Sequence, residues 1–261
     1  MGSSKAKKPP PSKTSLKPKN LKKKKKKTKS EKPKSVTNNV IESEAQEAIP
    51  VQEQGPLSFF LQHFQSSNQI RLSSLELESI EEKGVVELCD EELSLDKYLK
   101  KAFRDKWKHE LCESQLVEDD VGSPRVLIVS ASALRSLELF KAVRPLTKQC
   151  PAVKLFSKHM KVEEQVSLLK NRANIASGTP SRIKKLIDIG ALNLSRLQVL
   201  VLDLHTDVKG YFLFTLPQVR DEFWDLYKTC FHQRLMQGDL RICLHGPIPS
   251  SNAFKGKKKK P

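Results

Sequence analysis

Short, continuous apolar runs alternate with amphipathic segments over the second half of this chain. The runs have the length and character of buried strands and lie at residues 126–129, 153–156, 175–176, 197–202 and 240–244. Helical periodicity falls between them, at residues 133–140, 162–170, 180–189 and 219–231. Because strands that alternate with helices of this length form a covered parallel sheet, the pattern predicts an α/β fold with three layers.

Helical patterns also precede the first strand. One begins at Leu57 and continues through Phe60, Leu61 and Phe64, and a second covers residues 72–80. A third runs from Leu95 to Leu111, with Ser94 as its expected N-cap. These segments predict extra N-terminal helices in front of the sheet.

A helix start at residues 178–183 offers the best candidate for a binding site. Thr179 suits an N-cap, Pro180 suits the first turn, and Gly190 stands where a C-cap glycine belongs. Free N–H groups at such a helix start attract anions. The candidate residues for contact with an anion are therefore Thr179, Arg182, Lys184 and Lys185, and the resemblance described below implies that this anion is the RNA backbone. Equally, Thr179 and Pro180 could only start the helix while Arg182 pairs with a neighbouring carboxylate.

Four polar residues follow predicted strands, namely Ser130, Ser177, Asp203 and His245. The carboxyl ends of parallel strands are where such sheets bind ligands. Asp203 and His205 together invite an acid–base interpretation, but no nucleophile accompanies them. We expect His205 to be a loop residue and Asp203 to be a helix-capping or turn acid.

The net charge of +17 is concentrated in two tails. Residues 1–35 hold fifteen lysines and one glutamate, residues 255–261 hold five lysines, and the remaining body has a net charge of −2. The composition predicts a disordered, lysine-rich tail and linker at 1–56, a folded domain at 57–250 and a disordered basic tail at 251–261. The lysine runs predict nuclear import or RNA contact by Lys22, Lys23, Lys24, Lys25, Lys26, Lys27, Lys257, Lys258, Lys259 and Lys260.

The sequence gives little support to membrane, secreted or zinc-binding classes of protein. No apolar stretch approaches the ~20 residues that span a bilayer, and no signal peptide precedes the lysines, so we expect an intracellular protein without a membrane partner. The five cysteines are scattered without metal-ligand spacing, which predicts reduced structural thiols and no zinc site.

Two motifs resemble those of DEAD-box RNA helicases over about residues 125–245. Gly178-Thr179-Pro180-Ser181-Arg182 is similar to their RNA-contacting TPGR turn, and Val199-Leu200-Val201-Leu202-Asp203 is similar to the strand that ends in Asp-Glu-Ala-Asp. The tetrad here is Asp203, Leu204, His205 and Thr206, so the glutamate that would orient the attacking water is a leucine.

The remaining helicase chemistry is also altered. The phosphate-binding pattern Gly-x-x-x-x-Gly-Lys-Ser/Thr is absent, Ser130-Ala131-Ser132-Ala133-Leu134-Arg135 replaces the Pro-Thr-Arg-Glu-Leu-Ala turn, and His245-Gly246-Pro247 replaces Ser-Ala-Thr. The sixteen residues after His245 are too few for a second lobe of about a hundred residues or more. The resemblance implies one RecA-like lobe, a pseudo-helicase that is not an enzyme and uses no nucleotide or metal.

The whole pattern resembles the Cms family of proteins associated with the small-subunit pre-ribosome. The resemblance rests on residues 127–139, on the block Lys154-Leu155-Phe156-Ser157-Lys158-His159-Met160-Lys161-Val162 with Gln165 and Val166, and on residues 178–184 and 190–194. It implies a non-catalytic assembly factor of the small ribosomal subunit in the nucleolus. Its implied partners are pre-ribosomal RNA, small-subunit assembly proteins and small nucleolar RNA, with the chain monomeric inside a large complex. Such proteins usually begin with an acidic segment, whereas this sequence begins in lysines.

Two alternatives stay open. The body could be a nuclear protein-interaction scaffold whose tails serve import alone. It could also be an RNA-dependent enzyme that uses the strand-end residues. A thermal shift with ATP and magnesium separates the second alternative from the others, because it alone requires nucleotide.

Overall fold

The computed structural model describes residues 55–89, 93–113, 120–148, 150–158, 160–171 and 173–249. Every described residue belongs to one compact unit. The predictions for the tail lysines Lys22–Lys27 and Lys257–Lys260 lie outside the described residues.

A parallel sheet of six strands organises the domain, in the order β1-β6-β5-β2-β4-β3. The strands are β1 (Val85–Cys89), β2 (Val126–Val129), β3 (Ala152–Leu155), β4 (Ile175–Gly178), β5 (Val199–Asp203) and β6 (Arg241–His245). All five neighbouring pairs are parallel. The prediction of a parallel α/β sheet is confirmed, and five of the six strands fall where the apolar runs predicted them.

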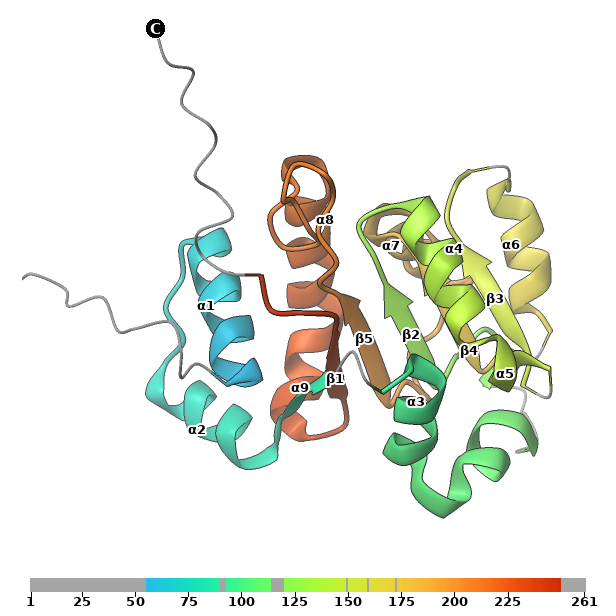
Figure 1. Cartoon of the computed structure of the whole chain (residues 1–261), viewed down its shortest axis with the longest axis horizontal. Coiled ribbons are helices and arrows are strands. Elements are labelled where there is room, and N and C mark those ends of the chain that lie inside the picture. Colours follow the sequence, from blue (N-terminus) through green and yellow to red (C-terminus); the bar gives the residue numbers. More distant parts are fainter. Residues whose placement is uncertain are drawn as a thin grey trace, which may run out of the picture. The chain divides into compact units, whose positions relative to one another are not determined.

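Helices connect and cover the strands (Figure 1). They are α1 (Pro56–Asn68), α2 (Ser74–Lys83), α3 (Leu95–Phe103), α4 (Ala133–Ala142), α5 (Arg144–Thr147), α6 (Val162–Leu169), α7 (Pro180–Asp188), α8 (Pro217–Leu226) and α9 (His232–Gln237). Short 3-10 or π-helical turns lie at Arg104–Lys106 (η2), His109–Glu113 (η3) and Tyr227–Phe231 (η5).

The sheet has two buried faces, because neighbouring residues of a strand point to opposite sides. Leu127, Val129 and Leu200 belong to one apolar cluster, which α1, α2, α6, α7, α8 and α9 cover. Val126 and Ile128 belong to the other, which α3, α4 and α5 cover (Figure 1). The strands therefore lie between two helical layers, as a three-layer fold requires.

Aromatic side chains fix α1 to the domain. The Phe60 ring packs edge-on against Tyr227 at a centroid distance of 5.1 Å, and Phe64 packs on the same ring at 4.9 Å. Trp224 contacts both phenylalanines, and all four side chains are buried. The apolar residues of the first predicted helix thus anchor it to α8 and η5.

Two helices and one strand differ from the sequence prediction. The helix predicted over 95–111 ends at Phe103, because Arg104 has a φ of +51° and the chain continues as η2 and η3. The helix predicted over 219–231 becomes π-helical at Tyr227. Strand β1 was not predicted, since Glu87 and Leu88 interrupt its apolar character and its register depends on pairing with β6.

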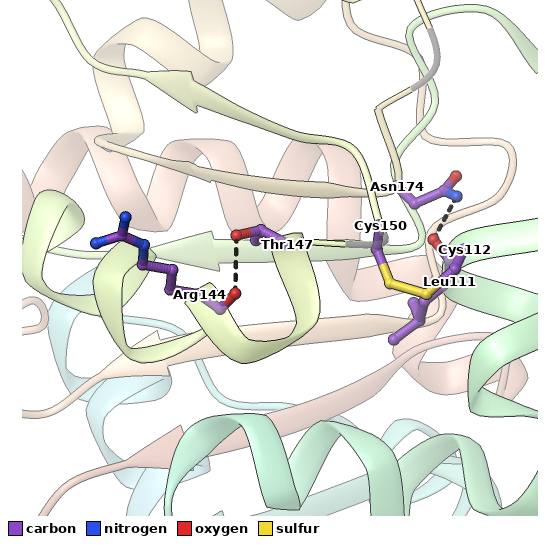
Figure 2. The surroundings of a disulfide bond; sticks show 6 residues. All are labelled: Leu111, Cys112, Arg144, Thr147, Cys150 and Asn174. Carbon is purple, nitrogen blue, oxygen red and sulfur yellow. Dashed lines mark hydrogen bonds between the residues drawn. A yellow bond between two sulfur atoms is a disulfide. The ribbon is translucent and has the colours of Figure 1, made fainter.

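The prediction that all cysteines are reduced is wrong for one pair. A disulfide joins Cys112, in η3, to Cys150, which precedes β3 (Figure 2). The two lie 38 residues apart in sequence, but folding brings their Cα atoms to 4.2 Å, a proximity that spacing along the chain does not reveal. Nearby, the Asn174 amide donates a hydrogen bond of 2.6 Å to the Leu111 carbonyl, so the same segment is tied twice to the edge of the sheet (Figure 2).

Candidate functional site

The predicted strand-end residues meet at one edge of the sheet. Register places Val129 of β2 beside Gly178 of β4 and Leu202 of β5, and it pairs Asp203 with His245. Ser130 and Ser177 are both fully buried near these ends. The grouping expected from the sequence is therefore present.

Asp203 ends β5 with its side chain 1% exposed, and an arginine from α4 neutralises it. Arg135 Nε donates to Oδ2 at 3.0 Å and Nη2 donates to Oδ1 at 2.8 Å, which is a bidentate ion pair. This hydrogen-bonded pairing raises the pKa of Arg135. The expectation that Asp203 caps a helix or closes a turn is therefore wrong: the carboxylate lies at the strand end, and both of its oxygens bind α4.

Serine hydroxyls complete this network. Ser130 Oγ and Ser136 Oγ lie 2.7 Å apart, and Ser177 Oγ donates to the Ser136 carbonyl at 3.1 Å. Ser132 caps α4, accepting from the Arg135 N–H at 3.2 Å. These bonds bring the first turn of α4 down onto the ends of β2 and β4, so the side chains of Ser130, Ser177 and Asp203 all bind residues of α4.

The rest of the altered Asp-Glu-Ala-Asp tetrad has separate surroundings. Leu204 is buried in the apolar core, and its N–H donates to the His245 carbonyl at 2.8 Å. His205 is exposed in an irregular segment, which confirms the loop prediction, and Thr206 is half-buried. Nδ1 of His245 is buried without a hydrogen-bond partner.

The connection from β1 to α3 is the first strand-to-helix turn at this edge. A phosphate-binding loop of a nucleotide-dependent motor occupies such a turn and supplies glycine amides and a lysine. Here the connecting residues 90–94 are Asp90-Glu91-Glu92-Leu93-Ser94. Three consecutive acids in this turn would repel phosphate groups.

At α7, Thr179 takes the predicted N-cap position, but its side chain makes no capping hydrogen bond. Its N–H donates instead to the Leu155 carbonyl of β3 at 3.1 Å. The preceding Gly178 must be glycine, because a Cβ there would lie 2.3 Å from the Leu155 oxygen. Close passage of β4 along β3 therefore sets where α7 begins.

Arg182 holds α7 against the segment before α6. Its Nη1 donates to Gln165 Oε1 at 2.7 Å and to the Met160 carbonyl at 3.3 Å. Gln165 is fully buried, and its amide donates to the carbonyls of Lys154 and Phe156. Arg182 thus pairs with an amide and a carbonyl rather than with the carboxylate of the alternative interpretation.

Lys184 and Lys185 lie on the other side of α7, in a groove against α8. The groove has a volume of about 320 Å³ and is lined by Ser181, Lys184, Lys185, Asp188, Ile189, Glu222 and Asp225. Lys184 Nζ lies 3.2 Å from Asp188 and 3.8 Å from Asp225, and its hydrogen bond to Asp188 raises its pKa. Three carboxylates against two lysines make this groove mixed in charge.

Sequence reasoning missed the two residues that organise these sites. Arg135 and Gln165 were noted only as parts of motifs. The one sequence signal for such residues is a polar residue on a helix face that is otherwise buried. This signal does not identify the partner, because Asp203 lies 68 residues from Arg135 in the sequence.

Over the described residues there is no cluster of three or more His, Cys, Asp or Glu side chains that could hold a metal ion. None of the described helices is long and apolar enough to cross a membrane.

These observations define a parallel α/β domain whose strand-end carboxylate is bound by an arginine of the same domain. Among solved structures, the chain is similar to a DEAD box protein from Methanococcus jannaschii (16% identity, TM-score 0.37, covering 76% of this chain and 50% of that one). It is also similar to the yeast DEAD-box splicing factor Prp28 (14% identity, TM-score 0.44, covering 65% and 37%).

Sequence relatives identify the family. The family model described as "CMS1: U3-containing 90S pre-ribosomal complex subunit" matches residues 3–245. Protein CMSS1 of Homo sapiens is 31% identical over 230 residues, covering 87% of this chain and 76% of that protein. Protein CMS1 of Chaetomium thermophilum is 48% identical over 91 residues, covering 34% and 36%. The chain belongs to the CMS1 family, so the resemblance drawn from its sequence is confirmed.

Proposed function

We propose that this protein is a non-catalytic assembly factor of the small ribosomal subunit, a pseudo-helicase platform that contacts pre-ribosomal RNA and other assembly proteins in the nucleolus. Membership of a family of 90S pre-ribosomal complex subunits supports a role in ribosome assembly. The observation that carries the non-catalytic part is the bidentate pair between Arg135 and Asp203.

An ATP-driven motor uses its strand-end carboxylates to hold magnesium and to orient water. In this chain both oxygens of Asp203 accept hydrogen bonds from Arg135, and the next residue is the buried Leu204. The turn that would hold phosphates carries Asp90, Glu91 and Glu92. Each difference removes a part that nucleotide chemistry requires, which supports the non-catalytic assignment over the enzyme alternative.

RNA contact is supported by charge. The fifteen lysines of residues 1–35 and the five of residues 255–261 give sequence-independent affinity for phosphates. The start of α7, with Thr179 and Arg182, is the candidate for contact by the folded domain. The family description, a U3-containing complex, supports pre-ribosomal RNA and small nucleolar RNA as partners and a nuclear, nucleolar location.

The groove between α7 and α8 favours a second candidate, a scaffold that binds a protein there. Its mixed charge and the half-exposed Ile189 suit a peptide better than a polyanion. In that case the body would contact assembly proteins and the lysine tails would serve import.

Nucleotide binding gives the first test. The full chain is melted with and without ATP and magnesium, and we predict no change in Tm, because no phosphate site is available. A second sample carries R135A, which frees Asp203. A saturable rise in the Tm of the unmodified chain with ATP would refute the non-catalytic assignment.

Gradient sedimentation of a cell lysate gives the second test. The full chain should sediment with 90S particles and shift to light fractions when ribosomal RNA synthesis is stopped. A chain that stays at the top of the gradient under both conditions would contradict a role in pre-ribosome assembly.

A further inference from the structure

The described domain carries a dense group of cations on α3 and the turn that follows it. Residues 95–109 contain six Lys or Arg residues and two acids, whereas the body as a whole, residues 36–254, has a net charge of −2. Five exposed cations form what we call the α3 ridge, namely Lys97, Lys101, Arg104, Lys106 and Lys108.

The charges of the α3 ridge are not neutralised by the surrounding protein. In the described part of the chain, no carboxylate lies within ion-pair distance of any of the five. The sixth cation of the segment, Lys100, pairs with Asp96 at 3.5 Å. The body as a whole has a small negative net charge, but five cations without an ion pair to a described residue lie on this one segment. The positive electrostatic potential of the described domain is therefore concentrated at the α3 ridge.

Local geometry holds these cations close together. Lys97 and Lys101 are spaced i and i+4, so they project from one side of α3, and Arg104 follows directly after the end of the helix. Arg104, with its φ of +51°, turns the chain at the end of the helix, so Lys106 and Lys108 follow on a new segment. Lys100 and Lys108 lie 5.2 Å and 5.8 Å from the Trp107 ring centroid, and these cation–π contacts offset their mutual repulsion.

A hollow of about 500 Å³ adjoins the ridge. Its lining includes Lys101 and Arg104 from the ridge and Arg241 from the start of β6. Its one acid, Glu87, accepts a hydrogen bond of 2.9 Å from the Tyr98 hydroxyl. Three cations against one bound carboxylate make the hollow suitable for an anion.

The carboxyl half of the α3 ridge, from Lys101 onward, lies away from the helicase-like edge of the sheet, whereas Lys97 is in the first turn of α3. Ala102 and Phe103, at the end of α3, line a second hollow with Val85, Val199 and Arg241, which begin β1, β5 and β6. The carboxyl half of α3 is therefore at the amino edge of the sheet, opposite Asp203 and the start of α7. Whatever binds this half of the ridge approaches a different face of the domain.

We propose that the α3 ridge binds the phosphate backbone of single-stranded RNA. The inference rests on the proposed contact with pre-ribosomal RNA and assigns that contact to a surface of the folded domain. Exposed apolar side chains, which anchor protein partners, are absent from residues 95–109: the exposed large hydrophobic residues of the described chain lie elsewhere. Leu88, which is 39% exposed, lines the adjoining hollow, but the ridge itself carries charge without exposed large apolar side chains, which favours a polyanion over a folded protein.

The test measures affinity of the full chain for fluorescent oligouridine over a range of salt concentrations. The ridge variant is K97Q/K101Q/R104Q/K106Q/K108Q, in which glutamine keeps a similar helix propensity. The matched control is K141Q/R144Q/K148Q/K158Q/K170Q, which removes four lysines and one arginine from exposed positions on other segments. Circular dichroism and Tm establish that both variants fold.

We expect the ridge variant to lower the log–log salt slope by up to about 3.5, at about 0.7 per lost phosphate contact, and to bind at least about tenfold more weakly in moderate salt. The control variant should keep the affinity and slope of the unmodified chain. Equal losses in both variants would overturn the proposal, because they would show that any five cations are equivalent.

Sedimentation of the same variants separates this claim from the proposed function. If the ridge variant binds oligouridine normally, the ridge claim is overturned, and sedimentation of the unmodified chain with 90S particles still supports the assembly role. If RNA affinity is unchanged while the variant leaves the 90S fractions, the ridge binds a protein, which also overturns the proposal. Failure of the unmodified chain to sediment with these particles refutes the proposed function alone.

Discussion

Arg135 determines which chemistry the strand-end edge can support. Its guanidinium is 25% exposed and spans the carboxylates of Asp203 and Glu138, with the shortest contact, to Glu138, at 2.6 Å. Because Asp203 is 1% exposed, its charge depends on this single arginine. The pair is thus both a structural tie between α4 and β5 and the reason that both carboxylate oxygens of Asp203 are occupied.

Removing the guanidinium should therefore be costly. We predict that R135A lowers the free energy of unfolding by about 2–4 kcal/mol, because a buried carboxylate is left unpaired. The double variant R135L/D203L should recover much of this loss, since it removes both charges. Urea denaturation of the three proteins checks the prediction, and an R135A variant as stable as the unmodified chain would contradict it.

His63 makes stability depend on acid pH. Burial among Phe59 and Phe212 lowers the pKa of its imidazole from 6.5 to about 4. In the unfolded chain His63 takes up a proton below about pH 6.5, whereas in the folded chain it does so only near pH 4. The free energy of unfolding therefore decreases as the pH falls from about 6.5 to about 4.

We predict that this group costs at most about 3 kcal/mol between neutral pH and pH 4. The variant H63F keeps an aromatic ring and removes the titration, so its stability should decline less steeply over the same window. Denaturant melts of both proteins at intervals of pH measure the difference. Parallel curves would show that His63 does not titrate as its burial implies.

At the scale of elements, the disulfide ties η3 to the segment before β3. In the described chain, Cys89, Cys230 and Cys243 are not part of a disulfide, and burial raises the pKa of Cys243. A crosslink over 38 residues reduces the entropy of the unfolded chain by the equivalent of about 4 kcal/mol.

We predict three titratable thiols in denaturant before reduction and five after it. Reduction should lower the Tm, and C112S/C150S should show the same lower Tm without responding to the reductant. Five thiols in the untreated protein would contradict the disulfide.

The elements also show what the sequence could and could not predict. Strands buried on both faces, such as β2 and β5, carry a continuous apolar signal and were found within two residues at either end. Edge strand β1 was missed because Leu88 is 39% exposed and the strand is defined by pairing with β6. The bend at Arg104 was missed because a positive φ is predictable from sequence mainly where a glycine stands, and this position is an arginine.

The candidate site was only partly predictable for the same reason. Shared strand ends follow from a parallel sheet, so the proximity of Ser130, Ser177 and Asp203 was correctly expected. The partners of Asp203 and Arg182 depend on how α4 and α6 pack, which local sequence does not encode. RNA contact by Thr179, Arg182, Lys184 and Lys185 stays a prediction.

At the scale of the whole molecule, positive charge is distributed unevenly along the chain. Twenty of the lysines belong to residues 1–35 and 255–261, while the body is close to neutral. Within the body, residues 95–109 are an exception, with six Lys or Arg residues against two acids. Under the proposed function, the lysines of the two tails would supply general phosphate affinity and the domain a defined geometry.

The most direct test of this account is crosslinking of the full chain to RNA in living cells, followed by sequencing of the attached fragments. The account predicts fragments concentrated in precursor ribosomal RNA and small nucleolar RNA, and it predicts that the ridge variant loses part of that set while the matched control variant keeps it. Fragments spread over all abundant RNAs in every sample would contradict a specific role for the folded domain.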